Sequence, residues 1–489
     1  MKLSVKNLGP IKQGEIDLSK RFSVFVGYNN SGKTYMAQAV WTLFRYLYTS
    51  GIFTIPLKMT TTFPQNLHEL KKSGFELNED NIKKLILFIE EHLKIETLNT
   101  FNSDNLGKDF SLQLKGVFDS LKNNTIKIRV DDDSNNKYYH LEKAGDSFVF
   151  SVRETTKSEF YKATTSIDTH LDMGESIFDK LFEIFTTVLG RNLGITEPPF
   201  FLPANRSFYP TFYKEMVYNE RLQNENRDKA IKEGQDIEKI KLLSRKPYTS
   251  PAGVLINSVY QLNFKGSPMS QPKAYYEDLI EELKVIIGGR ITESTKGNGL
   301  IEFSLALEDK NELEMHVASS SANQLATLYL YFKYWANASG NILIIDEPEE
   351  NLHPRNQIAL LNILMKFANR NNNRVIITTH SPLMTDAVNN HLHLGYLSEK
   401  YNKNLATLIQ ENNLDLDADA ALAHKDIGIY FFDGQNIKEY EVEEYGVDFK
   451  DFRKEQEKVA DNGDILRGLI LTEKKNQLRE QHQKTRAYV

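Results

Sequence analysis

Three short stretches of the chain are apolar at nearly every position. They lie at residues 22–26, 342–345 and 375–377. Runs of this length without polar alternation are typical of strands that are covered on both faces of a parallel sheet. Residues 35–46 follow the first run and contain no Gly or Pro, so they predict a helix. This succession of strand and helix predicts an α/β fold.

The intervening segments show other periodicities. Apolar residues within 78–95 have helical spacing, whereas residues 125–152 alternate around a polar turn at 131–136 and predict a β-hairpin. The aspartates of that turn lack the spacing of a calcium loop, so a solvated turn is the favoured interpretation. The pattern further predicts a charged helical protrusion over 214–246, a helix over 274–287, strands at 300–307 and 313–317, a small hairpin over 427–445, and a charged helix over 451–484.

The loop between the first strand and its helix matches the phosphate-binding pattern G-x-x-x-x-G-K-[ST] without a substitution. Its candidate nucleotide ligands are Gly27, Asn29, Asn30, Ser31, Gly32, Lys33 and Thr34. Glycines let the backbone wrap closely around a polyphosphate at the positive end of a helix. Lys33 is expected to reach the β- and γ-phosphates, and the Thr34 hydroxyl to ligate magnesium. A chance loop is the bland alternative, and the strand and helix on either side argue against it.

Two further predicted strands end in polar residues. Asp346 and Glu347 follow the strand at 342–345, and His380 follows the strand at 375–377. The carboxyl ends of parallel strands meet at the edge where open α/β sheets bind ligands. We therefore expect Asp346 to hold magnesium, Glu347 to polarise a water, and His380 to sense the γ-phosphate. A lone histidine is usually structural, and only its place at the strand end favours the sensor role.

With these motifs in hand, the chain resembles an ABC-type ATPase head of the OLD/RecF/SMC-like branch. It is most similar there to ATPase subunits of bacterial anti-phage systems of the Septu PtuA-type, PARIS AriA-type and retron-associated kinds. The residues that carry the resemblance are 2–11, the glycine loop, 201–207, 319–325, 346–354 and 379–382. The resemblance implies an ABC-type P-loop head with inserted helical and β elements.

The resemblance also implies roles for three polar clusters. Ser319, Ser320 and Ser321 would form a signature loop that acts in trans on the nucleotide of a second chain, although a glycine common in the family is missing. A plain helix N-cap is the alternative for these serines. Asn351 and His353 would couple the two sites. Asn205 and Arg206 stand where relatives place a metal- and water-sensing glutamine, and a surface arginine that caps a loop competes equally with that role.

Composition narrows the class of protein. The 489 residues are 40% hydrophobic and include no cysteine, which excludes disulfides and thiolate sites and fits a reducing cytoplasm. No apolar stretch approaches the length of a membrane span, and the chain begins with a predicted strand, so neither a membrane segment nor a signal peptide is expected. The net charge of −6 gives no global attraction to nucleic acid.

These patterns predict a discontinuous ATPase core. It would comprise residues 1–50 and 195–450, with an inserted lobe at 51–194, a helical protrusion at 210–250, and a charged helix with a basic tail at 451–489. OLD-type relatives carry a nuclease domain after the ATPase, and Asp415, Asp417 and Asp419 have the spacing of its metal-binding pair. No predicted strand delivers these acids, so a solvated loop is favoured. The basic tail is more often a solvated face than a partner or nucleic-acid contact.

Together, these features predict a magnesium-dependent ATPase without nuclease activity of its own. By resemblance, it would be the sensor or scaffold subunit of an anti-phage system. It would act as a homodimer or higher homo-oligomer and control a separate toxic effector encoded nearby. It would be cytoplasmic, contact no membrane, and bind nucleic acid weakly if at all. The alternative is a RecF/SMC-like repair ATPase that clamps DNA.

Overall fold

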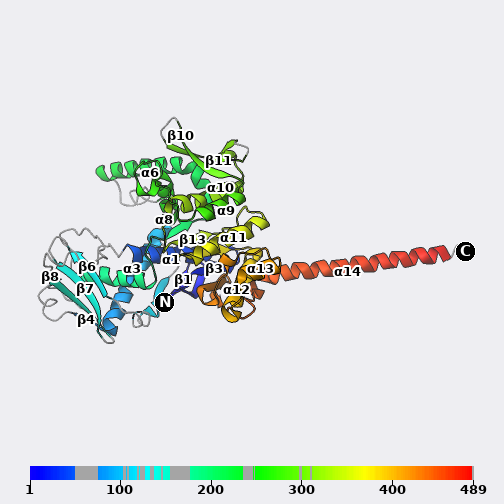
Figure 1. Cartoon of the computed structure of the whole chain (residues 1–489), viewed down its shortest axis with the longest axis horizontal. Coiled ribbons are helices and arrows are strands. Elements are labelled where there is room, and N and C mark those ends of the chain that lie inside the picture. Colours follow the sequence, from blue (N-terminus) through cyan, green and yellow to red (C-terminus); the bar gives the residue numbers. More distant parts are fainter. Residues whose placement is uncertain are drawn as a thin grey trace.

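A six-stranded sheet forms the centre of the molecule in the computed structural model (Figure 1). The structure describes residues 1–486 except 50–74, 103–105, 107–108, 118–120, 122–126, 133–136, 145–146, 155–176, 235–245, 247, 297–299 and 309–310. The strand order is β16 (Ile437–Tyr440), β15 (Ile427–Phe432), β3 (Phe22–Gly27), β14 (Arg374–Thr379), β13 (Ile342–Asp346), β9 (Phe200–Leu202). All pairs are parallel except β15 with β16. The predicted α/β class is confirmed.

The predicted hairpin over 427–445 is part of this sheet. β15 and β16 do pair antiparallel, but β15 also pairs in parallel with β3, from Ile427 opposite Phe22 to Phe432 opposite Gly27. All six residues of β15 are buried, as expected for a strand covered on both faces. The predicted hairpin is therefore present, and its first strand also extends the central sheet, which the prediction did not include.

A second layer lies against this sheet. β1 (Lys2–Leu8) pairs antiparallel with both β2 (Ile11–Asp17) and β5 (Ser111–Lys115). Helix α1 (Lys33–Tyr48) shares one buried apolar cluster with these strands and with α3 (Glu79–Phe101) and α5 (Ile177–Asn192). Much of the described part of the predicted lobe at 51–194 thus packs on the same core as the glycine loop. The domain limits themselves stay a prediction.

A third sheet extends from the far side of this layer (Figure 1). Its order is β4 (Phe75–Leu77), β8 (Ser147–Glu154), β7 (Lys137–Ala144), β6 (Lys127–Asp132), and all of its pairs are antiparallel. β6 and β7 form a hairpin within the predicted range 125–152, and β8 adds a third strand that the prediction did not include. Most of its polar turn, residues 133–136, lies outside the described residues.

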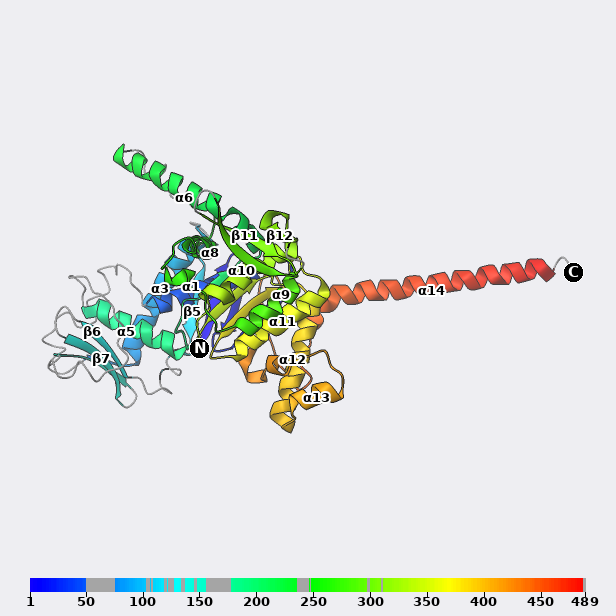
Figure 2. The same cartoon turned by 45° about the horizontal axis from the view of Figure 1, so that its top comes forward.

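The other face of the central sheet is covered by a mainly helical region. Its elements are α6 (Tyr209–Lys232), α8 (Ser250–Gln261), α9 (Glu277–Ile287), β10 (Arg290–Lys296), β11 (Leu300–Ala306), β12 (Glu312–Glu314), α10 (Ser320–Leu330), α11 (Pro354–Asn369), α12 (Pro382–Tyr401) and α13 (Leu405–Glu411). Helix α6 projects from the body, as predicted for 214–246, although 235–245 lie outside the described residues (Figure 2). The strand predicted at 313–317 is wrong in its second half, because residues 315–317 form a 3-10 turn.

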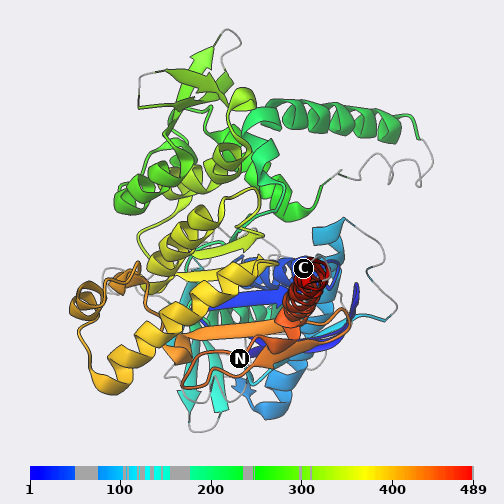
Figure 3. The same ribbon diagram turned by 90° about the vertical axis from the view of Figure 1, so that its right-hand side faces the viewer.

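Helix α14 (Lys450–Arg486) ends the described chain and confirms the helix predicted over 451–484. It leaves the body as a single rod on the side away from the third sheet (Figures 1 and 3). No helix in the described part of the chain is both long and apolar enough to cross a bilayer.

Candidate nucleotide-binding site

The glycine loop joins β3 to α1 at the carboxyl edge of the central sheet. Gly27, Asn30 and Gly32 have positive φ angles of 152°, 58° and 99°. A Cβ at Gly27 would collide with the carbonyl oxygen of Phe432, and one at Gly32 would lie 2.5 Å from Cγ1 of Ile11. Both positions therefore require glycine, both for backbone angle and for space.

The loop lines a cavity of about 850 Å³. Its other walls include Pro10, Tyr35, Glu347 and His380. Ser31 is buried in this wall, and its hydroxyl has no hydrogen-bond partner. An orphaned hydroxyl beside backbone N–H groups at the start of a helix fits a phosphate oxygen. The local geometry therefore fits the triphosphate that the sequence pattern predicts.

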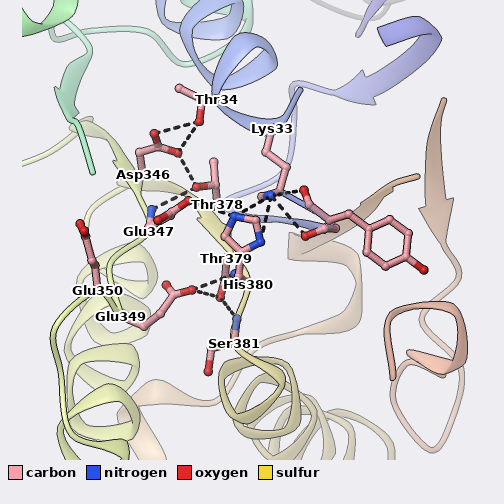
Figure 4. Close-up of polar contacts among 12 residues, drawn as sticks. Lys33, Thr34, Asp346, Glu347, Glu349, Glu350, Thr378, Thr379, His380 and Ser381 are labelled. Carbon is pink, nitrogen blue, oxygen red and sulfur yellow. Dashed lines mark hydrogen bonds and ion pairs between the residues drawn. The ribbon is translucent and has the colours of Figure 1, made fainter. Parts of the chain in front are cut away.

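Lys33 is buried at the floor of this cavity. Its Nζ donates to the carbonyl oxygens of Gly27 and Tyr28, at 3.2 and 2.9 Å, and lies 3.0 Å from Nε2 of His380 (Figure 4). Burial lowers the pKa of Lys33 to about 8, against the opposing effect of the nearby carboxylates. The ammonium form still predominates at neutral pH. A bound phosphate would favour that form further.

Thr34 and Asp346 meet at the start of α1. The threonine hydroxyl lies 2.9 and 3.0 Å from the two carboxylate oxygens, and Thr378 donates a further short hydrogen bond to the same carboxylate (Figure 4). Burial raises the pKa of Asp346, while the two threonine hydroxyls oppose that shift. A hydroxyl and a carboxylate at hydrogen-bond distance fit the preference of Mg²⁺ for hard oxygen ligands.

Glu347 combines an unusual backbone with a half-buried carboxylate. Its φ of 48° is left-handed, which is uncommon for a non-glycine residue, and its N–H donates to Oγ1 of Thr378 at 3.0 Å. Oε1 of Glu347 lies 3.0 Å from Nε2 of His380, in the cavity wall. The hydrogen bond from His380 lowers the pKa of Glu347, so the carboxylate stays ionised at neutral pH. Strained backbone of this kind clusters at functional sites.

The alternative of a surface arginine at position 206 is wrong. Arg206 is 1% exposed and lies under the loop that follows β13. Its guanidinium donates to the carbonyl oxygens of Asp346, Glu347 and Pro348 at 2.8, 3.3 and 3.1 Å, and to those of Pro203 and Gln324. Burial lowers its pKa to about 10, so it remains a cation. Arg206 therefore holds the backbone of the acidic loop.

The other sequence-predicted residues do not line the cavity of their own chain. Asn205 is exposed and is not one of the residues that line the cavity. Ser319 caps α10, where its hydroxyl accepts from the N–H of Ala322 at 3.2 Å and lies 3.0 Å from Oγ of Ser321, and Ser320 is exposed. Asn351 has a φ of 60°, and His353 caps α11 through Nδ1. Ser319 is thus the N-cap of α10 in this chain. A role of the three serines in trans stays a prediction.

Several residues that were not predicted from the sequence support this site. Glu349 accepts from Oγ1 of Thr379 at 2.6 Å and from the N–H of His380 at 2.8 Å, so it holds the backbone that carries the histidine (Figure 4). The second oxygen of Glu349 is shielded and has no partner, and burial raises its pKa. Gln324 of α10 donates to Glu350 and to the carbonyl oxygen of Ala204. The sequence signal that could have indicated Glu349 and Glu350 is the run of acids after Asp346.

The acids at the C-terminal D-x-D spacing lie apart from this site in the fold. Asp417 pairs with Lys366 of α11 and caps a 3-10 turn, while Asp415 and Asp419 are exposed. The preceding apolar run is helix α13, and no strand ends at these acids. No group of three or more His, Asp or Glu residues that could hold a metal occurs in the part of the chain that the structure describes.

The chain is similar to several solved structures and matches one family model. Similar solved structures include the Smc head domain of Pyrococcus furiosus with an extended coiled coil, bound to the C-terminal domain of ScpA (12% identity, TM-score 0.31, 94% of this chain and 98% of that chain). Another is the SMC head domain of Thermotoga maritima (11%, TM-score 0.29, 90% and 98%). No curated protein matches. A family model described as an AAA ATPase domain matches residues 1–385. The chain therefore belongs to the AAA ATPase domain family.

Proposed function

We propose that the chain hydrolyses ATP in the cavity between the glycine loop and the carboxyl ends of β13 and β14. One observation carries this proposal. At the cavity wall, Nε2 of His380 lies 3.0 Å from the buried Nζ of Lys33 and 3.0 Å from Oε1 of the ionised Glu347. In the absence of nucleotide, the amine and the carboxylate both contact the imidazole. A γ-phosphate placed among them would replace these contacts.

Each side chain then has one task. Lys33 and the loop N–H groups bind the phosphates, and Thr34 with Asp346 would hold Mg²⁺, which would neutralise the charge that develops on the phosphoryl oxygens. Glu347 orients and polarises the attacking water. His380 hydrogen-bonds the γ-phosphate, and Glu349 positions it through the backbone N–H. In this division Arg206 is a positioning residue, since it touches only backbone oxygens of the acidic loop.

The complete site is expected to need a second chain. The start of α10 presents Ser320 to solvent, together with free N–H groups of the first helical turn. Such an end suits the γ-phosphate of a partner chain. Arg206 would connect that contact to the acidic loop, because it binds both the carbonyl oxygen of Gln324 in α10 and that of Asp346.

The broader role we propose is that of the ATPase sensor or scaffold of an anti-phage system with a separate effector. The resemblance in the motifs supports this role, and the C-terminal acids are engaged in a turn and an ion pair rather than in a cluster at a strand end. The net charge of −6 disfavours the alternative, a DNA clamp.

Purification of the untagged protein from its native host tests the role. We expect a genetically linked protein to copurify, no cleavage of DNA or RNA by the isolated chain with Mg²⁺ or Mn²⁺ and ATP, and little stimulation of the ATPase by duplex DNA. Tight duplex binding without a partner, falling steeply with salt and accompanied by strong stimulation, would instead favour the clamp. Cleavage that is lost on mutation of Asp415 or Asp417 would overturn the separate effector.

A further inference from the structure

Thr378 lies beside the acidic end of β13, on the neighbouring strand. β13 and β14 are parallel, and their register places Thr378 opposite Asp346. Thr378 is 0% exposed and is not one of the residues that line the nucleotide cavity. Any effect of this residue on a bound nucleotide must therefore pass through the groups that it contacts.

The hydroxyl group of Thr378 contacts two residues of the site at once. It donates a short hydrogen bond to Oδ1 of Asp346, and it accepts from the backbone N–H of Glu347 at 3.0 Å (Figure 4). A threonine hydroxyl has one hydrogen to donate and lone pairs that accept, so it can make both bonds together. A valine of nearly the same shape could make neither.

The bond to Asp346 fixes the rotation of its carboxylate. The hydroxyl of Thr34 lies at nearly equal distances from the two carboxylate oxygens, 3.0 and 2.9 Å, and so does not distinguish them. Thr378 donates to Oδ1. Thr34 also lines the cavity and is itself an expected ligand of Mg²⁺, whereas Thr378 has no such second task. Hydrogen-bond partners of this kind orient metal ligands.

The bond from Glu347 holds the backbone that carries the second carboxylate. Glu347 follows the last residue of β13 and has a left-handed φ of 48°. Thr378 binds its N–H, and Arg206 binds its carbonyl oxygen at 3.3 Å. Backbone in a sparsely populated region persists only where the surrounding groups determine it. The direction of the Glu347 side chain therefore depends on Thr378 as well as on Arg206.

We propose that Thr378 is a positioning residue that sets the carboxylate of Asp346 and the carboxylate of Glu347 relative to each other. The inference rests on the proposed ATP hydrolysis and deepens it, because one buried hydroxyl would align the metal ligand with the residue that polarises water. Loss of this hydroxyl should weaken metal binding and slow the chemical step. Nucleotide binding without metal, which uses the glycine loop and Lys33, should not change.

Three substitutions in the full chain separate this role from a general packing effect. Thr378→Val removes both hydrogen bonds at nearly constant shape, and Thr378→Ser keeps the hydroxyl. Thr327→Val is the matched control, because Thr327 of α10 is also 0% exposed and its hydroxyl has no hydrogen-bond partner among the described residues. Calorimetric titration with a non-hydrolysable ATP analogue, in EDTA and in saturating Mg²⁺, measures the contribution of the metal without turnover. Single-turnover hydrolysis at saturating Mg²⁺ measures the chemical step.

The two readouts should change together in Thr378→Val and in neither of the other variants. The gain in affinity that Mg²⁺ provides should be about tenfold smaller than in the wild type, and hydrolysis at least about tenfold slower, while affinity in EDTA is retained. If Thr378→Val does not fold, Thr378→Ala gives the same comparison with Thr378→Ser. A hydroxyl-free variant that behaves like Thr327→Val, or that loses only one of the two properties, would overturn the inference. A wild-type protein that does not hydrolyse ATP would instead overturn the proposed function.

Discussion

The carboxyl edge of the central sheet and helix α14 differ in which side chains they bury and which they expose. At the sheet edge, charged side chains are buried or half-buried and are held in place by other protein groups, as Arg206 and Asp346 show. On α14, apolar side chains such as Leu466 and Leu469 are 58% and 61% exposed. The first region fits a small anionic ligand, whereas the second leaves apolar side chains in contact with solvent.

The largest expected effect comes from removing the amine at the cavity floor. Lys33→Ala deletes the buried cation that faces the phosphates, so we expect ATP binding and phosphate release to fall to background. The fold should persist, since the amine makes only local contacts within the site. Isothermal titration and a phosphate-release assay measure the two losses. ATP binding of wild-type strength in this variant would remove Lys33 from the site.

Arg206→Met should have the next largest effect. It would leave the buried carbonyl oxygens of the acidic loop without donors, which typically costs about 3–5 kcal/mol for a broken buried network. Arg374→Met is the control, because burial also lowers the pKa of Arg374 to about 10 while its guanidinium donates to Leu18, away from the acidic loop. Urea unfolding should show both variants destabilised. At urea concentrations well below those that unfold either variant, only Arg206→Met should lower ATPase activity. Equal activity of the two variants would argue against a positioning role for Arg206.

A moderate effect is expected from pH. Because burial lowers the pKa of Lys33 to about 8, the nucleotide-free amine loses its proton above that pH, whereas the phosphate-bound amine keeps it. ATP affinity should therefore be level below about pH 7 and fall by up to tenfold per unit above about pH 8. Lys33→Arg does not titrate in this range and should remove the fall if it still binds ATP. A wild-type affinity that is constant up to pH 9.5 would contradict the lowered pKa.

Truncation after residue 470 should have the smallest effect on chemistry. The side chains of residues 471–475, the part of the removed segment whose burial is described, are exposed. ATP turnover per chain should therefore change less than about twofold, and the free energy of unfolding by less than about 1 kcal/mol. Assembly should weaken instead, as seen by light scattering. A truncated chain that assembles normally but loses ATPase activity would contradict the expectation that this segment of α14 affects assembly and not ATP turnover.

The sequence predicted one of these regions far better than the other. Gly27, Lys33, Asp346 and His380 could be assigned because phosphate binding imposes a fixed spacing and because strand ends in a parallel sheet converge. Arg206 could not be placed, since its partners are backbone carbonyl oxygens distant in sequence, which leave no side-chain pattern.

The position of β15 in the central sheet was also not predicted. The run from Ile427 to Phe432 has no polar alternation, so its pattern already fitted a strand covered on both faces. Its parallel pairing with β3 joins segments about 400 residues apart and has no local signal. For α14 the helix itself was predictable, but the exposure of its side chains up to residue 475 was not, because a charged helix with one apolar stripe usually packs on its own domain.

The central claim is that Glu347 activates water on an ATP held by the glycine loop, and single-turnover hydrolysis by Glu347→Gln tests it most directly. The amide keeps the size of the side chain but cannot polarise a water, so ATP should bind with near wild-type affinity and be hydrolysed at least about a hundredfold more slowly. The ATP-bound form should accumulate as a dimer. Hydrolysis by Glu347→Gln at the wild-type rate would contradict the account.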